Sequence, residues 1–309
     1  MDGFPFLPTE DVAPLSVPGA LQRTLRSPIA CTGVGLHSGQ PVKVRLVPAP
    51  IGHGIVFLRT DLGHSIPARF DAVVDTRLCT VVGMGDARVG TIEHLMAALH
   101  ASGVDNLLIE VDSAEIPVFD GSSEPWLFLL DCAGIDVQSA ERAVIEVLRT
   151  VRVEDGDAFA ELRPGHHGFT MALSIAFDAD AIGRQARTFT LEPGAFRREL
   201  SRARTFGQKH EIDGLQRAGL ARGGSLDNAV VVDGGKVLNP AGLRMTDEFV
   251  RHKLLDAVGD LALAGGPLQG RFVGHKSGHA LNNRLLRALF ADAANWRLVA
   301  EATPSLIAA

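Results

Sequence analysis

Three titratable side chains recur at four-residue intervals in the segment EFVRHKLLDAVGDLALA, residues 248–264. His252, Asp256 and Asp260 stand at i, i+4 and i+8, so a helix would stack them on one face with neighbours about 5–6 Å apart. An imidazole and a carboxylate one turn apart can share a divalent ion, which makes His252 and Asp256 a candidate metal dyad. The same stripe is also typical of a solvated polar face, and the pattern alone leaves both interpretations open.

A second pair of chemical groups, Glu93 and His94, lies side by side in TIEHL, residues 91–95. Such a pair is more often exposed, or contains a buried histidine with an ordinary hydrogen-bond partner. Beside the dyad, however, His94 would complete a set of two imidazoles and one carboxylate, which leaves zinc a fourth position for water. Glu93 would then stand next to a ligand, where a general base belongs.

Two further clusters are weaker signals. In GHKSGH, residues 274–279, the glycines permit a tight turn, so a polar loop is the simpler interpretation. The functional interpretation makes one histidine a general acid and Lys276 an anion contact. The segment RTFG, residues 204–207, ends a basic stretch that we expect to be a solvated helix face followed by a turn; the stretch contains Arg197, Arg198, Arg202 and Arg204.

The elements that must position these groups are predicted by periodicity and turn signals. In the first half we expect strands at 41–47, 54–58, 80–83 and 107–111, with helices at 91–101 and 125–132. In the second half we expect strands at 143–153, 159–163, 170–177 and 270–274, and a helix at 248–264. The polar stretch 134–142 is the candidate linker, and residues 201–240 form an excursion of the second half. Each half sets mixed strands beside an amphipathic helix, which suggests a duplicated α+β unit.

Composition excludes several classes of protein. The chain has 309 residues, enough for about two domains, and 30 basic against 36 acidic residues give a net charge of −6, which argues against a nucleic-acid-binding role. No apolar run approaches the ~20 residues of a membrane span. Cys31, Cys79 and Cys132 form no CxxC pair and fit a reducing compartment. Residues 1–20 hold four prolines, lack the basic start of a signal peptide, and are expected to be a flexible extension.

Several motifs occur together and in order: GVGLHSG (33–39), TIEHLMAAL (91–99), SRARTFG (201–207), SLDNAVVVD (225–233), DEFVRHKLLDAVGDLAL (247–263) and KSGHALNN (276–283). With them the chain resembles the UDP-3-O-acyl-N-acetylglucosamine deacetylases of lipid A biosynthesis, from about residue 21 to about residue 297. The resemblance implies a zinc amidase of two similar α+β domains, each a mixed sheet packed with helices, with the active site between them. The domains are expected at 21–136 and 137–309, and an insert of the second would form a hydrophobic passage.

Carried onto this sequence, the resemblance makes His94, His252 and Asp256 the ligands of one catalytic Zn²⁺ and Glu93 the general base. It makes His279 the general acid or cationic stabiliser, Asp260 the partner of His279, and Thr205 a stabiliser of the oxyanion. Phe206 would lie in the substrate groove, and Lys253 and Lys276 would meet the uridine diphosphate end.

The implied reaction is hydrolysis of the N-acetyl group of UDP-3-O-(3-hydroxyacyl)-N-acetylglucosamine. We expect a cytoplasmic monomer without a transmembrane segment, and the sequence leaves open a transient contact with the inner membrane surface. Two alternatives stay open: an amidase for another N-acyl sugar nucleotide, and a non-catalytic zinc-containing protein that binds a nucleotide sugar. The presence of Glu93 and His279 weighs against the second, because a structural zinc site needs neither and is usually closed by four ligands.

Overall fold

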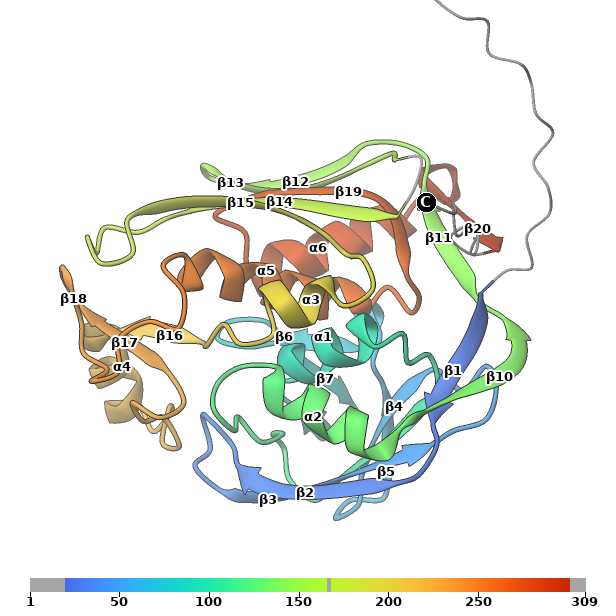
Figure 1. Cartoon of the computed structure of the whole chain (residues 1–309), viewed down its shortest axis with the longest axis horizontal. Helices are drawn as coiled ribbons and strands as arrows, with labels where there is room; N and C mark the ends of the chain where they lie inside the picture. The colour runs from blue at the N-terminus through green and yellow to red at the C-terminus, as the bar shows by residue number, and fades with distance from the viewer. Residues whose placement is uncertain (1–19, 166–167, 301–309) are drawn as a thin grey trace, which may run out of the picture.

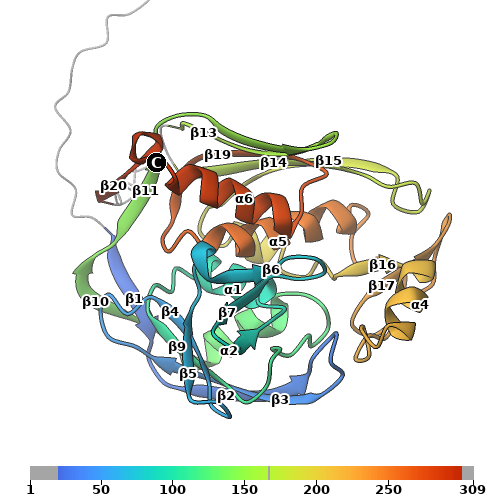
Figure 2. The same ribbon diagram turned by 180° about the vertical axis from the view of Figure 1, so that it is seen from behind.

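Two sheets enclose the central helices of the protein (Figures 1 and 2). The computed structural model describes residues 20–165 and 168–300. The first sheet has the order β2-β3-β9-β4-β5 and consists of β2 (Ile29–Val34), β3 (Pro41–Pro48), β9 (Leu107–Val111), β4 (Ile55–Arg59) and β5 (His64–Pro67). Its central strand, β9, runs antiparallel to β3 and parallel to β4. Alternate residues of β3 are buried, as expected for a sheet with one face on the core.

The second sheet repeats this arrangement strand for strand. Its strands β12 (Val151–Asp155), β13 (Ala158–Arg163), β19 (Leu268–His275), β14 (Phe169–Ala176) and β15 (Arg184–Thr190) follow the same order. The central strand, β19, is again antiparallel to one neighbour, β13, and parallel to the other, β14. Strand β11 (Ala143–Val147) pairs with the start of β19, and β20 (Trp296–Ala300) pairs with β11 and extends the sheet further.

The helices repeat as well. In each half one helix precedes the central strand and another follows it: α1 (Glu93–Ala101) and α2 (Glu124–Ala133) flank β9, while α5 (Glu248–Ala262) and α6 (His279–Phe290) flank β19. The predicted class, α+β with two similar domains, is therefore confirmed. The domain boundaries at residues 20/21 and 136/137 stay predictions.

Each half also carries an insert at the equivalent point, between its last hairpin strand and the helix that precedes its central strand. In the first half this insert contains η1 (Phe70–Ala72) and the small sheet β6 (Val73–Asp75), β7 (Val81–Met84) and β8 (Ala87–Val89). In the second half it contains α3 (Ala195–Glu199), α4 (Lys209–Arg217) and the small sheet β16 (Phe206–Gln208), β17 (Val230–Asp233) and β18 (Lys236–Val237). The small sheet and α4 of the second insert project from one side of the molecule, at the left of Figure 1.

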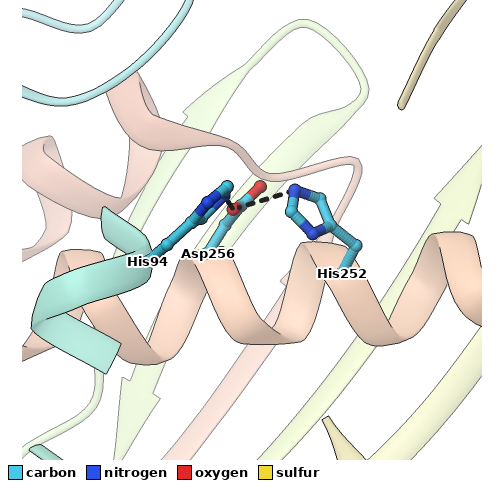
Figure 3. A group of neighbouring side chains, drawn as sticks. All are labelled: His94, His252 and Asp256. Atoms are coloured by element: carbon cyan, nitrogen blue, oxygen red, sulfur yellow. Dashed lines mark ion pairs between the residues drawn. The ribbon is translucent and has the colours of Figure 1, made fainter. Parts of the chain in front are cut away.

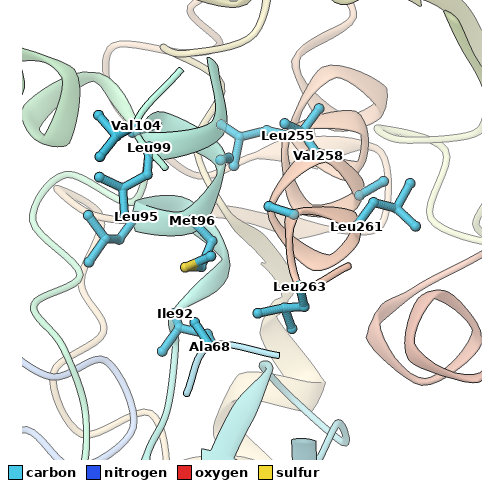
Figure 4. Packing of buried hydrophobic residues seen from close by; sticks show 14 of the residues in the cluster. Ala68, Ile92, Leu95, Met96, Leu99, Val104, Leu255, Val258, Leu261 and Leu263 are labelled. Carbon is cyan, nitrogen blue, oxygen red and sulfur yellow. The ribbon is translucent and has the colours of Figure 1, made fainter. Parts of the chain in front are cut away.

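The core lies where α1 and α5 cross between the sheets. Both helices are buried on nearly all sides, which requires apolar residues around most of their circumference. Figure 4 shows Leu95, Met96 and Leu99 of α1 beside Leu255 and Val258 of α5. The helices approach closely at Gly259, where an added Cβ atom would lie 2.0 Å from the carbonyl oxygen of Glu93.

Several sequence-based expectations need correction. The candidate linker 134–142 contains a strand, β10 (Ile135–Glu141), which pairs with β1 (Leu21–Leu25) with one irregularity in register, and its role as a linker stays a prediction. The expected strand at 143–153 is two strands, β11 and β12, and the periodicity did not predict α6. The expected solvated basic helix face is wrong at its end, because Arg204 is buried.

The flexible extension expected at residues 1–20 lies outside the described residues, apart from Ala20. Within residues 20–165 and 168–300, the helices are all too short or too polar to cross a membrane.

Candidate active site

The three expected metal ligands come together in the core. His94 projects from α1, and His252 and Asp256 lie one turn apart on α5 (Figure 3). Asp256 Oδ1 lies 3.3 Å from His252 Nε2 and 3.6 Å from His94 Nε2, and the ligand atoms all fall within 4.8 Å of one another. All three side chains are buried, so the solvated-face interpretation of the α5 stripe is wrong.

The donor set fits a divalent metal ion. Four ligands held tetrahedrally at about 2.0–2.2 Å from zinc lie about 3.3–3.6 Å from one another, which matches the observed separations from Asp256. Asp256 Oδ1 is buried without a hydrogen-bond partner, although such an atom normally has one. Burial lowers the pKa of His252 to about 4, which keeps this imidazole neutral and able to ligate near pH 7.

Glu93 adjoins His94 and is equally buried. Burial raises the pKa of the Glu93 carboxyl above its usual value, although the neighbouring His279 favours the ionised form. The backbone N–H of Thr80 donates a 3.0 Å hydrogen bond to Glu93 Oε2. A carboxylate held by one bond and otherwise desolvated is suited to accept a proton.

His279, the first residue of α6, contacts the third member of the α5 stripe. Its Nδ1 lies 2.9 Å from Asp260 Oδ2. Burial works against the charged imidazolium, but the Asp260 carboxylate outweighs it and raises the pKa of His279 to about 9. Asp260 also accepts hydrogen bonds from the Thr80 hydroxyl at 2.6 Å and from Asn282 Nδ2 at 2.8 Å. The structure therefore favours a cationic His279 at neutral pH.

One pocket of about 200 Å³ contains most of these groups. Both halves line it, and the candidate ligands, Glu93, His279, Thr205, Phe206 and Lys253 are among the lining residues. Thr205 is fixed by its backbone N–H, which donates to Gly121 O at 2.8 Å. Phe206 stands edge-on to Phe177 and Phe249, so one wall of the pocket is aromatic.

The two lysines occupy different surroundings. Lys253 Nζ donates to Asp256 Oδ2 at 2.8 Å. Burial disfavours the ammonium form of Lys253, but the Asp256 carboxylate favours it more strongly, so the pKa of Lys253 is raised. Lys276 lies outside the pocket lining and pairs with Asp157 across the surface. The structure thus brings Lys253 to the candidate metal ligands and leaves Lys276 outside the pocket lining.

Comparison with known proteins identifies the family of the chain. Residues 22–291 match the family model described as UDP-3-O-acyl N-acetylglycosamine deacetylase. The chain belongs to this family.

Similar proteins cover nearly the whole chain of this member of the deacetylase family. The chain is 50% identical over 283 residues to the UDP-3-O-acyl-N-acetylglucosamine deacetylase of Shewanella woodyi, covering 90% of this chain and 92% of the relative. Proteins with the same name from Stenotrophomonas maltophilia strain K279a and Chromobacterium violaceum are 49% and 51% identical over 288 and 281 residues. These matches cover 92% and 89% of this chain, and 95% and 92% of the two relatives.

Several polar groups around the site of this deacetylase family member were not predicted from the sequence. Thr80 bridges Glu93 and Asp260, and Asn282 holds the second oxygen of Asp260. Buried Glu115 accepts hydrogen bonds from the Thr91 hydroxyl and from the backbone of His37 and Ser38. Thr91 adopts a φ of 58°, which is strained for a β-branched residue, directly before the helix that carries Glu93. Threonine and asparagine at these positions carry no periodic signal, because their role depends on partners far away in the sequence.

Proposed function

We propose that the protein hydrolyses the N-acetyl group of UDP-3-O-(3-hydroxyacyl)-N-acetylglucosamine to acetate and a free amine, in lipid A biosynthesis. The observation that carries this proposal is the meeting of His94, His252 and Asp256 with Glu93 and His279 around one pocket. A set of three ligands beside a candidate base and a cationic acid suits hydrolysis of an amide better than a structural metal site. Membership of the deacetylase family and the names of the relatives support the substrate class.

Zinc is the ion that we propose, held by His94, His252 and Asp256. Two imidazoles and one carboxylate are a ligand set typical of catalytic zinc, and the unpartnered Asp256 Oδ1 supports a cation at this point. A bound zinc ion would supply Lewis-acid polarisation of the acetyl carbonyl and a lower pKa for the attacking water. The remaining steps fall to side chains of this chain.

Glu93 acts in this proposal as the general base. Its carboxylate takes the proton of the attacking water, and the Thr80 N–H holds the other end of the group in place. Because burial raises the pKa of Glu93, the carboxylate is a stronger base than an exposed glutamate would be.

His279 and Thr205 serve the later half of the reaction. As the carbonyl oxygen gains negative charge, the Thr205 hydroxyl and the imidazolium of His279 stabilise it more strongly than they stabilise the ground state. His279 then gives a proton to the departing amine, and Asp260 keeps the imidazole charged and oriented until that moment.

The two ends of the substrate would contact different groups of the protein. We assign the acyl chain to the aromatic wall of Phe206 and Phe177 and to a hydrophobic passage formed by the second insert, since each buried CH₂ contributes about 0.8 kcal/mol. Lys253 and Lys276 would meet the uridine diphosphate, which requires that each lysine exchange its present carboxylate partner for an anion of the substrate.

Acetate release tests the proposal directly. The purified protein should release acetate from the acylated UDP-sugar, lose this activity on chelation and regain it with added zinc. Glu93→Gln should keep the metal and lose most turnover, by about 10²–10⁴-fold, because only the proton acceptor is removed. His94→Ala should instead lose metal affinity.

The alternatives give other results. A binding protein would retain the sugar nucleotide without releasing acetate, and an amidase of different specificity would prefer another N-acyl nucleotide sugar in a substrate panel. Glu93→Gln with wild-type turnover would remove Glu93 from the mechanism.

A cytoplasmic location is part of the proposal. Cys31, Cys79 and Cys132 are free thiols in the structure, which suits a reducing compartment. The monomeric state and a transient contact with the inner membrane surface stay predictions.

A further inference from the structure

A buried ion pair lies at the N-terminus of α5, one turn before His252. Arg204 and Glu248 are 6% and 0% exposed. Arg204 Nε donates to Glu248 Oε1 at 2.8 Å, and Arg204 Nη2 donates to Glu248 Oε2 at 3.1 Å. The same carboxylate accepts the backbone N–H groups of Arg204 and Arg244, at 3.1 and 2.6 Å. Burying two charges this deeply is costly unless they are paired and hydrogen-bonded; here both carboxylate oxygens accept hydrogen bonds, and Arg204 Nη2 also donates to Gly242 O at 2.9 Å.

The pair holds a short segment of the second insert, residues 203–205, against α5. Each backbone N–H in this segment has a separate partner: Ala203 donates to Leu200 O, Arg204 to Glu248, and Thr205 to Gly121 O. Glu248 and His252 lie one turn apart on α5, so they face the segment together. Of these anchors, the Glu248 carboxylate is the only charged one.

The carbonyl group of the segment reaches the candidate ligand. Ala203 O lies 3.0 Å from His252 Nδ1. A carbonyl oxygen can only accept, so Nδ1 must carry the proton and Nε2 keeps its lone pair. Nε2 is the atom that lies 3.3 Å from Asp256 Oδ1, among the candidate ligand atoms.

We propose that Arg204 and Glu248 are positioning residues for the metal site and for Thr205. The pair fixes residues 203–205, and through them it fixes the tautomer and ring orientation of His252 and the place of the Thr205 hydroxyl. The inference rests on the proposed function, because it treats His252 as a metal ligand. It adds that a carboxylate outside the pocket lining determines how well that ligand binds.

The substitution Glu248→Gln tests the pair with little change of volume. An amide presents one acceptor and one donor, so its NH₂ group would face Arg204 Nη2 or the N–H of Arg244, donor against donor. The segment should shift, and the hydrogen bond from His252 Nδ1 to Ala203 O should weaken. Loss of a partner that orients a ligating histidine typically reduces metal affinity about 10–100-fold.

Arg59→Gln is the matched control. Arg59 is also a buried arginine, 7% exposed, and it pairs with Asp61 and donates to Arg88 O in the first half. The substitution Arg59→Gln should lower the melting temperature without altering the proposed metal site. Arg204→Lys is the second variant: it keeps the charge but loses the forked geometry, so the affinity should fall in the same direction by less.

The experiment titrates the metal-free full chain with Co²⁺ against a competing chelator and records the ¹⁵N shifts of the His252 imidazole. We expect Glu248→Gln to weaken Co²⁺ binding about tenfold or more, with the His252 shifts moving toward a mixture of tautomers. Arg59→Gln should keep both wild-type values. Wild-type affinity and tautomer in Glu248→Gln, or in Arg204→Lys if the first variant does not fold, would overturn the inference. Failure of the wild-type chain to bind Co²⁺ would instead overturn the proposed metal site.

Discussion

At the scale of single residues, the site depends on carboxylates whose surroundings differ sharply. Asp256 keeps one oxygen without a partner, whereas both oxygens of Asp260 are occupied by Thr80, Asn282 and His279. The first is therefore free to bind a cation, and the second can only orient and charge its histidine. Two aspartates at the same spacing on one helix thus acquire different roles through their partners.

Asp260→Asn should move the basic limb of the pH–rate profile to lower pH. In the wild type, burial lowers and Asp260 raises the pKa of His279, with a net value of about 9. The proposed mechanism needs His279 protonated, so it predicts that activity falls as the pH rises through that pKa. Without the Asp260 carboxylate, the strongest influence that opposes burial is gone and only Glu93 still favours the imidazolium, so the pKa falls and activity is lost at lower pH. The measurement is kcat/KM between pH 5 and 10.

The control for that profile is Asn282→Ala, which removes a neutral donor from Asp260 and leaves the charge. Its basic limb should stay near that of the wild type, and its acid limb, assigned to the raised pKa of Glu93, should stay in place as well because no charge is removed. A basic limb of Asp260→Asn that coincides with the wild-type limb would contradict the role of Asp260.

At the scale of elements, periodicity predicted α1 and α5 closely, and it predicted the stripe that carries His252, Asp256 and Asp260. It could not predict α6, because GHKSGH reads locally as a polar turn and the helix begins only at His279. The burial of Arg204 has no signal in the sequence for a similar reason: arginine is mostly exposed in proteins, and the buried partner of this one, Glu248, lies 44 positions away.

Gly259→Ala should separate α1 from α5. The new Cβ atom would lie 2.0 Å from Glu93 O and 2.7 Å from Glu93 C, both backbone atoms, so one helix must move. Overpacking of this kind costs about 1–3 kcal/mol. Because the displaced backbone belongs to Glu93, next to His94, turnover should fall even where the variant remains folded. Denaturant unfolding and acetate release measure the two effects.

Gly214→Ala is the counterpart on α4, where an added Cβ atom meets nothing within 4 Å. It should be neutral or stabilise the protein by up to about 1 kcal/mol, as alanine does at an open helical position. If Gly259→Ala and Gly214→Ala have equal stability and equal turnover, the close contact of α1 and α5 does not restrict the residue at position 259.

At the scale of the whole molecule, the fold is a repeat whose halves meet at the site. The two sheets share their strand order and pairing directions, and an insert stands at the same point of each. The motifs predicted two similar α+β domains, but the sequence shows no alignable repeat. The correspondence lies in pairing directions, such as β4 parallel to β9 and β14 parallel to β19, which many different side chains can satisfy. The contacts between halves were equally hidden, since Thr80 and Asp260 are 180 positions apart.

Metal removal should therefore lower the stability of both halves together, because His94 belongs to the first half and His252 and Asp256 belong to the second. A ligand that binds only the folded state adds about 4 kcal/mol when its free concentration is a thousand times its Kd. At pH 7 the neutral His252, with a pKa of about 4, needs no deprotonation, so the gain is not reduced by proton release there. Calorimetry should show one unfolding transition at a higher temperature with zinc than with a chelator.

Two variants of α1, His94→Ala and His100→Ala, distinguish stabilisation by the metal from a general change in stability. His94→Ala removes the only candidate ligand contributed by the first half within the described residues, and the shift of the melting temperature on adding zinc should shrink strongly. His100→Ala alters the same helix at its other end, away from the pocket lining, so its metal-dependent shift should equal that of the wild type even if its baseline is lower. If zinc raises the melting temperature of His94→Ala as much as that of His100→Ala, the ion is held by the second half alone, and the two halves do not share it.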